Sequence, residues 1–161
     1  MNEIVVGLLQ KEDIPKIYEF MKNVIISIPY YSDEAKLEEP KQFEPEIISK
    51  NLTEIESKCL YVVAKDGDKI AGVLNGYYGG GVIWGNWLGV GKEYRRQGVA
   101  QKMIEYMEAE SRKLGCHKFW CDTRTDNLEV IALQEKLGYI KVGELKDHWY
   151  HLDFYLWEKN L

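Results

Sequence analysis

Apolar residues in the first part of the chain form a short strand-like run and then follow helical spacing. The run Glu3–Leu9 predicts a strand. The next apolar positions recur every three or four residues, as expected for one face of a helix: Ile14, Ile17, Met21, Val24 and Ile28. Asp13 can cap this helix, Pro15 suits its first turn and Pro29 stops it.

The pattern then changes to a polar and acidic segment. Tyr30–Pro40 predicts a loop, and Pro45 opens a second helix. Three runs rich in β-branched and aromatic residues follow it: Cys59–Ala64, Ile70–Tyr78 and Val82–Val90. The turn signals Asp66-Gly67 and Gly79-Gly80-Gly81 separate these runs, so they predict an antiparallel meander.

From Gln97 to Gly115 the spacing is helical again. One face of this helix carries apolar and small residues: Ala100, Met103, Ile104, Met107, Ser111 and Leu114. The remaining elements are a strand, a helix that Asp126 or Asn127 caps, and two strands: Lys118–Thr123, Leu128–Leu137, Tyr139–Leu145 and Trp149–Trp157. The order β-α-α-β-β-β-α-β-α-β-β predicts an α/β fold whose mixed sheet is antiparallel at first and has one parallel step. No repeat or linker divides residues 1–161, so we expect a single domain.

Composition narrows the class of protein. Of the 161 residues, 45% are hydrophobic and 29% are charged, which is the balance of a globular chain, and the formal net charge of -5 argues against a nucleic-acid partner. The acidic balance leaves room for a cationic acceptor such as an amine. Three cysteines, Cys59, Cys116 and Cys121, are too few and too scattered for a disulfide framework or a zinc site, so no metal is expected. We see no signal peptide and no membrane-spanning run, and we expect a cytoplasmic protein.

The most informative segment joins a strand end to a helix start, at Val90–Ala100. Arg95 and Arg96 are followed by Gly98, which lets a ligand approach the backbone, and by Ala100, which adds little bulk. The free N–H groups and the dipole of a helix N-terminus favour a phosphate there, and the two guanidinium groups add charge-assisted hydrogen bonds. The alternative is an ordinary strand–turn–helix with surface arginines, but the combination at one junction favours the phosphate site.

This segment resembles motif A of the GNAT acetyltransferases, Arg/Gln-x-x-Gly-x-Gly/Ala, which binds the pyrophosphate of acetyl-CoA. Arg95, Gly98 and Ala100 fill its defined positions, whereas Lys92 stands where the family often has proline. Asn127 through Gly138-Tyr139 is similar to the second conserved helix of the family. The resemblance extends over nearly the whole chain and is strongest over 88–139.

The resemblance implies an N-acetyltransferase that transfers acetyl from acetyl-CoA to a primary amine by direct attack in a ternary complex. It implies that the central parallel strands splay apart, with the cofactor arm between them. The implied cofactor-binding residues are Leu88, Val90, Arg95, Arg96, Gln97, Gly98, Val99, Ala100 and Asn127. The N–H of Val90 would stabilise the oxyanion. Asn127 has a second interpretation as a plain helix N-cap, and the two interpretations are compatible.

Two departures from the family concern catalysis. Gln134 stands where many members have a tyrosine that protonates the leaving thiolate, and glutamine cannot act as an acid. Asn86 lies on the strand where many members carry a glutamate base, and it could only position a water. Remote candidates for the base are two histidines and two acids, for which a surface or structural role is the simpler interpretation: His148, His151, Glu144 and Asp153.

The acceptor site is the least defined. Tyr30 and Tyr31, with Asp33 and Glu34 nearby, could bind an ammonium group through cation–π and charge contacts, or could belong to a solvated loop. The acceptor itself stays open, and so does the oligomeric state, for which a homodimer is one expectation. A non-catalytic CoA-binding or sensory module is the alternative function. A different nucleotide-binding α/β protein is a third possibility, although no Gly-x-Gly-x-x-Gly follows a strand.

Overall fold

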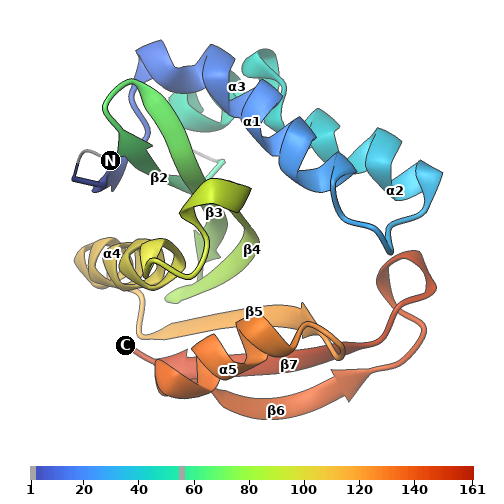
Figure 1. Ribbon diagram of the computed structural model, residues 1–161. Helices are drawn as coiled ribbons and strands as arrows, with labels where there is room; N and C mark the ends of the chain where they lie inside the picture. Colours follow the sequence, from blue (N-terminus) through green and yellow to red (C-terminus); the bar gives the residue numbers. More distant parts are fainter. Residues whose placement is uncertain (1–2, 55–56) are drawn as a thin grey trace.

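The computed structural model describes residues 3–54 and 57–161, which build one mixed sheet with helices on both faces (Figure 1). The seven strands lie in the order β1-β2-β3-β4-β5-β7-β6. Their bounds are Val5–Leu8 (β1), Cys59–Asp66 (β2), Lys69–Gly79 (β3), Val82–Val90 (β4), Lys118–Arg124 (β5), Ile140–Leu145 (β6) and Phe154–Asn160 (β7). Neighbouring strands are antiparallel except β4 and β5, which are parallel. The predicted α/β fold with a mixed sheet is confirmed.

The helices divide between the two faces of the sheet. Their bounds are Ile14–Ile26 (α1), Asp33–Glu38 (α2), Pro45–Thr53 (α3), Val99–Lys113 (α4) and Leu128–Lys136 (α5). Helix α1 packs against β3 and β4, and α3 packs against β2, whereas α4 packs against β1 to β4. The alternation of β2 serves both layers, because Tyr61 and Val63 face the α1 side and Val62 and Ala64 face the α4 side. No helix in the described ranges is long and apolar enough to cross a bilayer.

Some local predictions were wrong, each for a physical reason. Tyr30–Pro40 is not all loop, because Ser32 accepts a hydrogen bond from Ala35 N at 3.2 Å and caps α2, and the 3₁₀ helix η2 (Glu39–Phe43) follows. Asp13 does not cap α1 with its side chain; the carboxylate is buried and accepts hydrogen bonds from two lysines instead. The last strand begins at Phe154 rather than at Trp149.

Two further details of the predicted elements need correction. Residues Trp149–His151 form the 3₁₀ helix η4, in a turn where Asp153 accepts a hydrogen bond from Asp147 N at 2.9 Å. On α4, Leu114 lies beyond the end of the helix and is exposed, and Glu108 is buried in the helix face instead. The bounds of β4 and the parallel β4–α4–β5 step are as predicted.

The sheet splits between β4 and β5. The two strands pair only over Val82–Gly85 and Lys118–Cys121, and beyond that point they diverge, so that the halves of the sheet separate in Figure 1. The β3–β4 pairing has a bulge beside Asn75, where its register shifts. The parallel pairing of β4 with β5 ends at the same level. There the N–H of Trp87 donates to Asn75 Oδ1 at 3.1 Å instead of to a backbone carbonyl.

Candidate functional site

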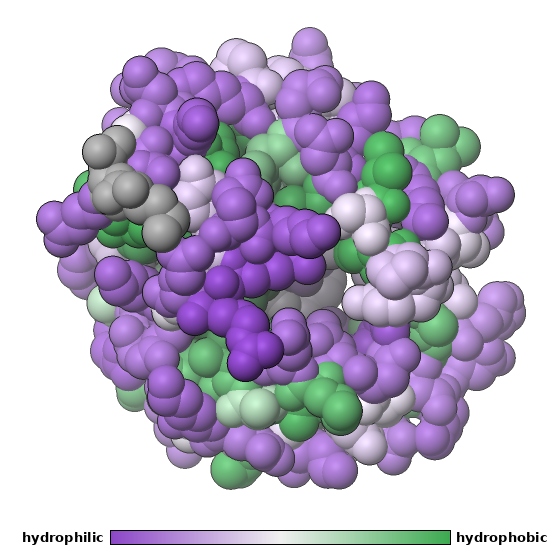
Figure 2. All heavy atoms as spheres, viewed as in Figure 1, coloured by the Kyte–Doolittle hydropathy of each residue, from purple (hydrophilic) through white to green (hydrophobic). Residues whose placement is uncertain are grey.

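A cavity of about 580 Å³ opens between the end of β4, the start of α4, the end of α1 and the start of α5. We call it the main cavity. Nine of the residues that the sequence singled out line it: Tyr30, Leu88, Val90, Arg95, Arg96, Gly98, Val99, Ala100 and Asn127. Figure 2 shows a hollow near the centre of this face, with strongly hydrophilic residues beside it over the turn that precedes α4. Most of the candidate cofactor residues that the sequence predicted therefore lie around one space.

The N-terminus of α4 points its free backbone groups at the main cavity. Gly98 occupies the N-cap position with φ 78, a left-handed conformation that suits glycine, and no side chain caps the first turn. A Cβ built on Gly98 would meet no atom of residues 3–54 or 57–161 within 4 Å, so the approach to the helix end is open. The first N–H groups of the helix have no partner inside the helix, and together with the helix dipole they form a site that fits an anion.

The turn before α4 supplies the positive charge. Arg95 Nε donates to the carbonyl of Val90 at 3.1 Å, which holds its guanidinium group beside the end of β4. Arg96 also lines the cavity and has a positive φ of 60. Gln97 is different, because its amide donates to the carbonyl of Glu93 at 2.7 Å and its side chain is not part of the cavity lining. Two guanidinium groups and one helix terminus thus border the same space.

The edge of β4 that faces the split is unpaired at its end. The N–H of Gly91 donates to the carbonyl of Ala71 on β3 at 2.9 Å. Because backbone groups of successive strand residues point to opposite sides, the N–H and C=O groups of Val90 and Leu88 point away from β3, toward the split. Both residues line the main cavity, so this edge can receive hydrogen bonds from an extended ligand.

Asn127 has the capping role that its second interpretation describes. Its side-chain oxygen accepts from Val130 N at 3.4 Å at the start of α5, and the residue also lines the main cavity. The cap does not use the amide protons of Asn127, so the side chain remains able to donate toward the cavity.

A smaller cavity of about 80 Å³ adjoins the main cavity at the closed end of the split, and we call it the inner cavity. Asn86 and Gln134 line it, each already engaged. The amide nitrogen of Gln134 donates to Thr123 Oγ1 at 2.7 Å and to Cys121 Sγ at 3.1 Å, which uses both of its protons. Asn86 Nδ2 donates to Gln42 Oε1 at 2.7 Å.

The segment after α1 forms an aromatic cluster that the sequence identified only in part. The ring of Tyr31 lies 6.1 Å from that of Trp87 and 6.3 Å from that of Tyr150. Glu39, which lies in the segment predicted as a loop, accepts hydrogen bonds from Tyr150 Oη at 2.7 Å and from Trp87 Nε1 at 2.9 Å. Burial, with a smaller contribution from the charge of Glu39, raises the pKa of Tyr31 above its ordinary value. No sequence signal connects these partners, because the Tyr150–Glu39 contact spans 111 residues.

Tyr30 lies at the border between this cluster and the main cavity. Its ring is 6.0 Å from that of Tyr31, and the guanidinium group of Arg124 stacks over it at 3.2 Å from the ring centre. Arg124 is buried and also bonds Asp126 through Nη2. Tyr30 therefore already has a cation over its ring, which the sequence did not reveal.

The remote candidates for a general base have other contacts. Lys146 forms ion pairs with Glu144 and Asp153, at 2.6 and 2.9 Å, and His151 Nδ1 lies 2.7 Å from Asp147 Oδ1 at the surface. None of the four candidates, His148 included, is part of the lining of either cavity. A surface or structural role therefore accounts for the contacts of these side chains.

The cysteine of the inner cavity is not an activated nucleophile. Burial raises the pKa of the Cys121 thiol to about 12, and the charge of Asp122 acts in the same direction. The pKa of Asp122 is itself raised, mainly by burial, against a hydrogen bond from Trp149 Nε1 at 2.9 Å. The thiol is therefore protonated near neutral pH.

Comparisons with known proteins agree with this geometry. A family model described as the acetyltransferase (GNAT) family matches residues 25–139. An acetyltransferase of Agrobacterium fabrum is 30% identical over 118 residues, which cover 71% of this chain and 85% of that protein. Among solved structures, a GNAT-family acetyltransferase from Streptococcus pneumoniae superposes with a TM-score of 0.79 at 18% identity, over 99% of this chain and 100% of that one. The PaiA N-acetyltransferase from Thermoplasma acidophilum, solved with coenzyme A, gives 0.77 at 15% identity, over 99% of each chain.

Proposed function

The chain belongs to the GNAT acetyltransferase family, and from that premise we propose that it transfers the acetyl group of acetyl-CoA to a primary amine by direct attack in a ternary complex. It is an acyltransferase, and its cofactor is acetyl-CoA, the acetyl donor of this family. The family assignment replaces the third possibility, an unrelated nucleotide-binding α/β protein. The amine acceptor and the ternary mechanism are the proposal.

The observation that carries the proposal is the continuity of the site along β4. The main cavity joins the N-terminus of α4 to the unpaired edge at Val90 and Leu88, and the inner cavity adjoins it at the closed end of the split. We place the diphosphate at Gly98, Val99 and Ala100, with Arg95 and Arg96 neutralising its charge. The open space at Gly98 supports this placement, because a side chain there would occupy the cradle.

The β4 edge would hold the arm of the cofactor. Val90 and Leu88 offer backbone N–H and C=O groups that no neighbouring strand uses, which matches the amides of a pantetheine chain. Asn127 can donate to the same arm while its oxygen caps α5. Bound acetyl-CoA supplies a thioester carbonyl that an amine can attack. The N–H of Val90 is the proposed donor to the oxygen that becomes negative during this attack.

The chain supplies little acid–base chemistry at the inner end of the site. Gln134 has no free amide proton and so cannot donate to a leaving thiolate, whereas Asn86 keeps one amide proton beyond its bond to Gln42 but cannot act as an acid. A thiolate whose conjugate acid has a pKa of about 8.5 is a tolerable leaving group near neutral pH. The residues of the site thus support catalysis mainly by proximity and by the oxyanion donor.

We place the acceptor on the side of the site that Tyr30 and Tyr31 border. Glu39 organises this side, because it links the 3₁₀ helix η2 to Trp87 on β4 and to Tyr150 in the turn before β7. Aromatic rings and a carboxylate in one cluster are compatible with an amine acceptor. The proposal leaves the identity of that amine open.

A pair of matched glycine variants tests the phosphate placement. Gly98 and Gly115 flank α4, have φ values of 78 and 80, and have nothing within 4 Å of a built Cβ. Gly98→Glu puts a carboxylate where the diphosphate would lie, so we expect calorimetric titration to detect no acetyl-CoA binding. Gly115→Glu imposes the same strain and charge at the other end of the helix, and it should bind like the wild type. Equal affinity of both variants would refute the placement.

The alternative of a non-catalytic CoA-binding module is favoured by the engaged amides of Gln134 and Asn86. A thiol-release assay with a panel of amines separates the two functions. Turnover with any amine excludes the module, whereas tight acetyl-CoA binding without turnover over a broad panel favours it.

A further inference from the structure

The inner cavity is larger than an acetyl group needs, and we propose that it lets this protein use propionyl-CoA and butyryl-CoA as acyl donors as well as acetyl-CoA. This inference rests on the proposed function, because the same β4 edge would hold the donor. The main and inner cavities share three lining residues, Trp87, Leu88 and Val130, so they adjoin each other.

The order of the contacts along β4 directs the acyl end into the inner cavity. The cradle at Gly98 lies beyond the C-terminal end of the strand, Val90 and Leu88 come next, and Gly85 lies further back. A strand advances about 3.3 Å per residue, so Gly85 is roughly 10 Å from Leu88. With the carbonyl oxygen at the N–H of Val90, the alkyl group beyond it therefore points back along β4 toward Leu88, which lines both cavities, and toward the inner cavity that extends to Gly85.

The inner cavity ends where β4 and β5 begin to pair. Gly85 is paired with Cys121 there, and a Cβ on Gly85 would come within 2.6 Å of the ring of Phe119. This ring therefore closes the end of the cavity. Hydrocarbon side chains from five elements line it: Leu74, Leu88, Ile104, Phe119 and Val130.

Most polar side chains of the lining already have hydrogen-bond partners. Cys121 Sγ and Thr123 Oγ1 accept from the amide of Gln134, and Asp122 accepts from Trp149 Nε1. The thiol of Cys121 is neutral, so no charge on it opposes a hydrocarbon chain. Gln134 Oε1 is buried and has no hydrogen-bond partner among the described residues.

The volume sets the length of chain that fits. A dry apolar cavity of about 150 Å³ in another protein holds benzene, with six carbons. A volume of about 80 Å³ is roughly half of that, which corresponds to about three carbons. The methyl group of acetyl uses one of them, so an ethyl or a propyl group also fits. Burying each added methylene strengthens binding by about fourfold.

The transfer itself keeps the same balance for each donor. The amine nitrogen forms a bond to the acyl carbonyl carbon, the carbon–sulfur bond breaks, and the electron pair leaves with the sulfur. The proton lost by the nitrogen ends on the thiolate or in solvent. Only the alkyl group on the carbonyl differs.

Calorimetric titration of the whole chain with a series of donors tests the proposal without an acceptor. The probes are free CoA, acetyl-CoA, propionyl-CoA, butyryl-CoA and hexanoyl-CoA. We expect Kd to fall by about fourfold from acetyl to propionyl and again from propionyl to butyryl, with no further gain for hexanoyl. Weaker or equal binding of propionyl- and butyryl-CoA overturns the proposal. Tightening that continues through hexanoyl also overturns it, because the chain then lies outside the inner cavity.

A matched pair of cysteine variants identifies the cavity responsible. Cys121→Met fills the inner cavity and should remove the gain for propionyl- and butyryl-CoA. Cys59→Met makes the same change on β2, outside both cavities, and should keep the gain. A gain that persists in Cys121→Met contradicts the assignment, and the wild-type series decides alone if that variant does not fold. If the wild-type protein bound none of the CoA compounds, that result would instead refute the proposed function.

Discussion

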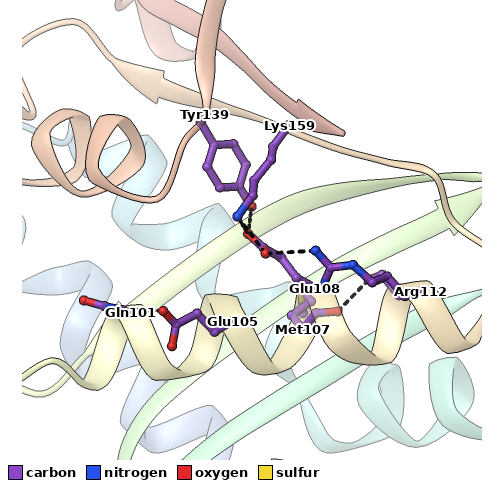
Figure 3. A network of polar contacts seen from close by, with 8 residues as sticks. Gln101, Glu105, Met107, Glu108, Arg112, Tyr139 and Lys159 are labelled. Carbon is purple, nitrogen blue, oxygen red and sulfur yellow. Dashed lines mark hydrogen bonds and ion pairs between the residues drawn. The ribbon is translucent and has the colours of Figure 1, made fainter. Parts of the chain in front are cut away.

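The buried carboxylate of Glu108 ties α4 to the other half of the split sheet (Figure 3), and removal of one of its partners should be strongly destabilising. Glu108 is only 3% exposed. Both of its oxygens accept from Lys159 Nζ on β7 at 2.8 Å, and Oε1 also accepts from Tyr139 Oη at 3.0 Å. Lys159→Met leaves this carboxylate buried with one neutral donor and the more distant Arg112, whose Nη2 is 3.7 Å away.

Breaking a buried ion pair by removing one partner costs about 3–5 kcal/mol. We expect Lys159→Met to fall near about 3 kcal/mol, because Tyr139 remains as a donor. In a chain of this size each kcal/mol lowers Tm by roughly 2–4 °C, so the expected drop in Tm is roughly 6–12 °C. Urea unfolding followed by circular dichroism measures the free energy, and a thermal scan measures Tm.

A double-mutant cycle separates this pair from general damage to the fold. Glu108→Gln with Lys159→Met should cost clearly less than the sum of the two single changes, because neither charge is then left unpaired. Arg112→Gln is the control, since that side chain is 48% exposed and should cost less than about 1 kcal/mol. The reasoning would be refuted if the costs of Glu108→Gln and Lys159→Met simply added in the double variant, or if either of these two single changes cost less than about 1 kcal/mol.

Two further predictions concern other polar contacts. Burial opposes ionisation of Asp13, but hydrogen bonds and charge from Lys65 and Lys16 outweigh it and hold its pKa below the ordinary value. The stabilisation is therefore complete above the unfolded pKa of about 3.9 and is lost as the pH falls through the lower folded pKa, so the stability gap between wild type and Asp13→Asn should shrink from pH 5 to pH 2. Tyr150→Phe removes the hydrogen bond to Glu39 and should lower stability by about 1–2 kcal/mol in urea unfolding. Its acetyl-CoA affinity should not change, because Tyr150 does not line the main cavity; a loss of affinity at full stability would contradict the separation of donor and acceptor sides.

The parts of the fold that follow from local pattern were predictable, and those that depend on distant contacts were not. The bounds of β4 and the glycine at the start of α4 follow from alternation and from a turn signal a few residues long. The short helix α2 was missed because six residues give almost no periodicity, although Ser32 was available as a cap. The turn of Trp149–His151 looked like a strand because it is aromatic, whereas contacts of Asp153 shape it.

The candidate site shows the same division. Residues around the phosphate cradle lie within one continuous segment, so their chemistry was visible in order along the chain. The acceptor side is assembled from η2, β4 and the turn before β7, and its central carboxylate, Glu39, had no sequence partner to reveal it. The sequence shows only that Gln134 is an amide and cannot act as an acid. Its contacts with Thr123 and Cys121, which engage both amide protons, are visible only in the structure.

The bulge beside Asn75 connects the fold to the proposed chemistry. A buried strand edge without partners is costly, because each unpaired N–H or C=O group loses its hydrogen bonds with water. On the side of β4 that faces β3, the bulge leaves the N–H of Trp87 without a backbone acceptor, and the fully buried side chain of Asn75 accepts its hydrogen bond instead. On the opposite side, Leu88 and Val90 have no such side-chain partner among the described residues except Arg95, which donates to the carbonyl of Val90, and this free edge faces a cavity large enough for an extended ligand. A fold that satisfies the β3 side of the strand at the bulge and leaves the other side open in a cavity keeps that edge for a ligand, and the amides of a CoA arm match it in kind.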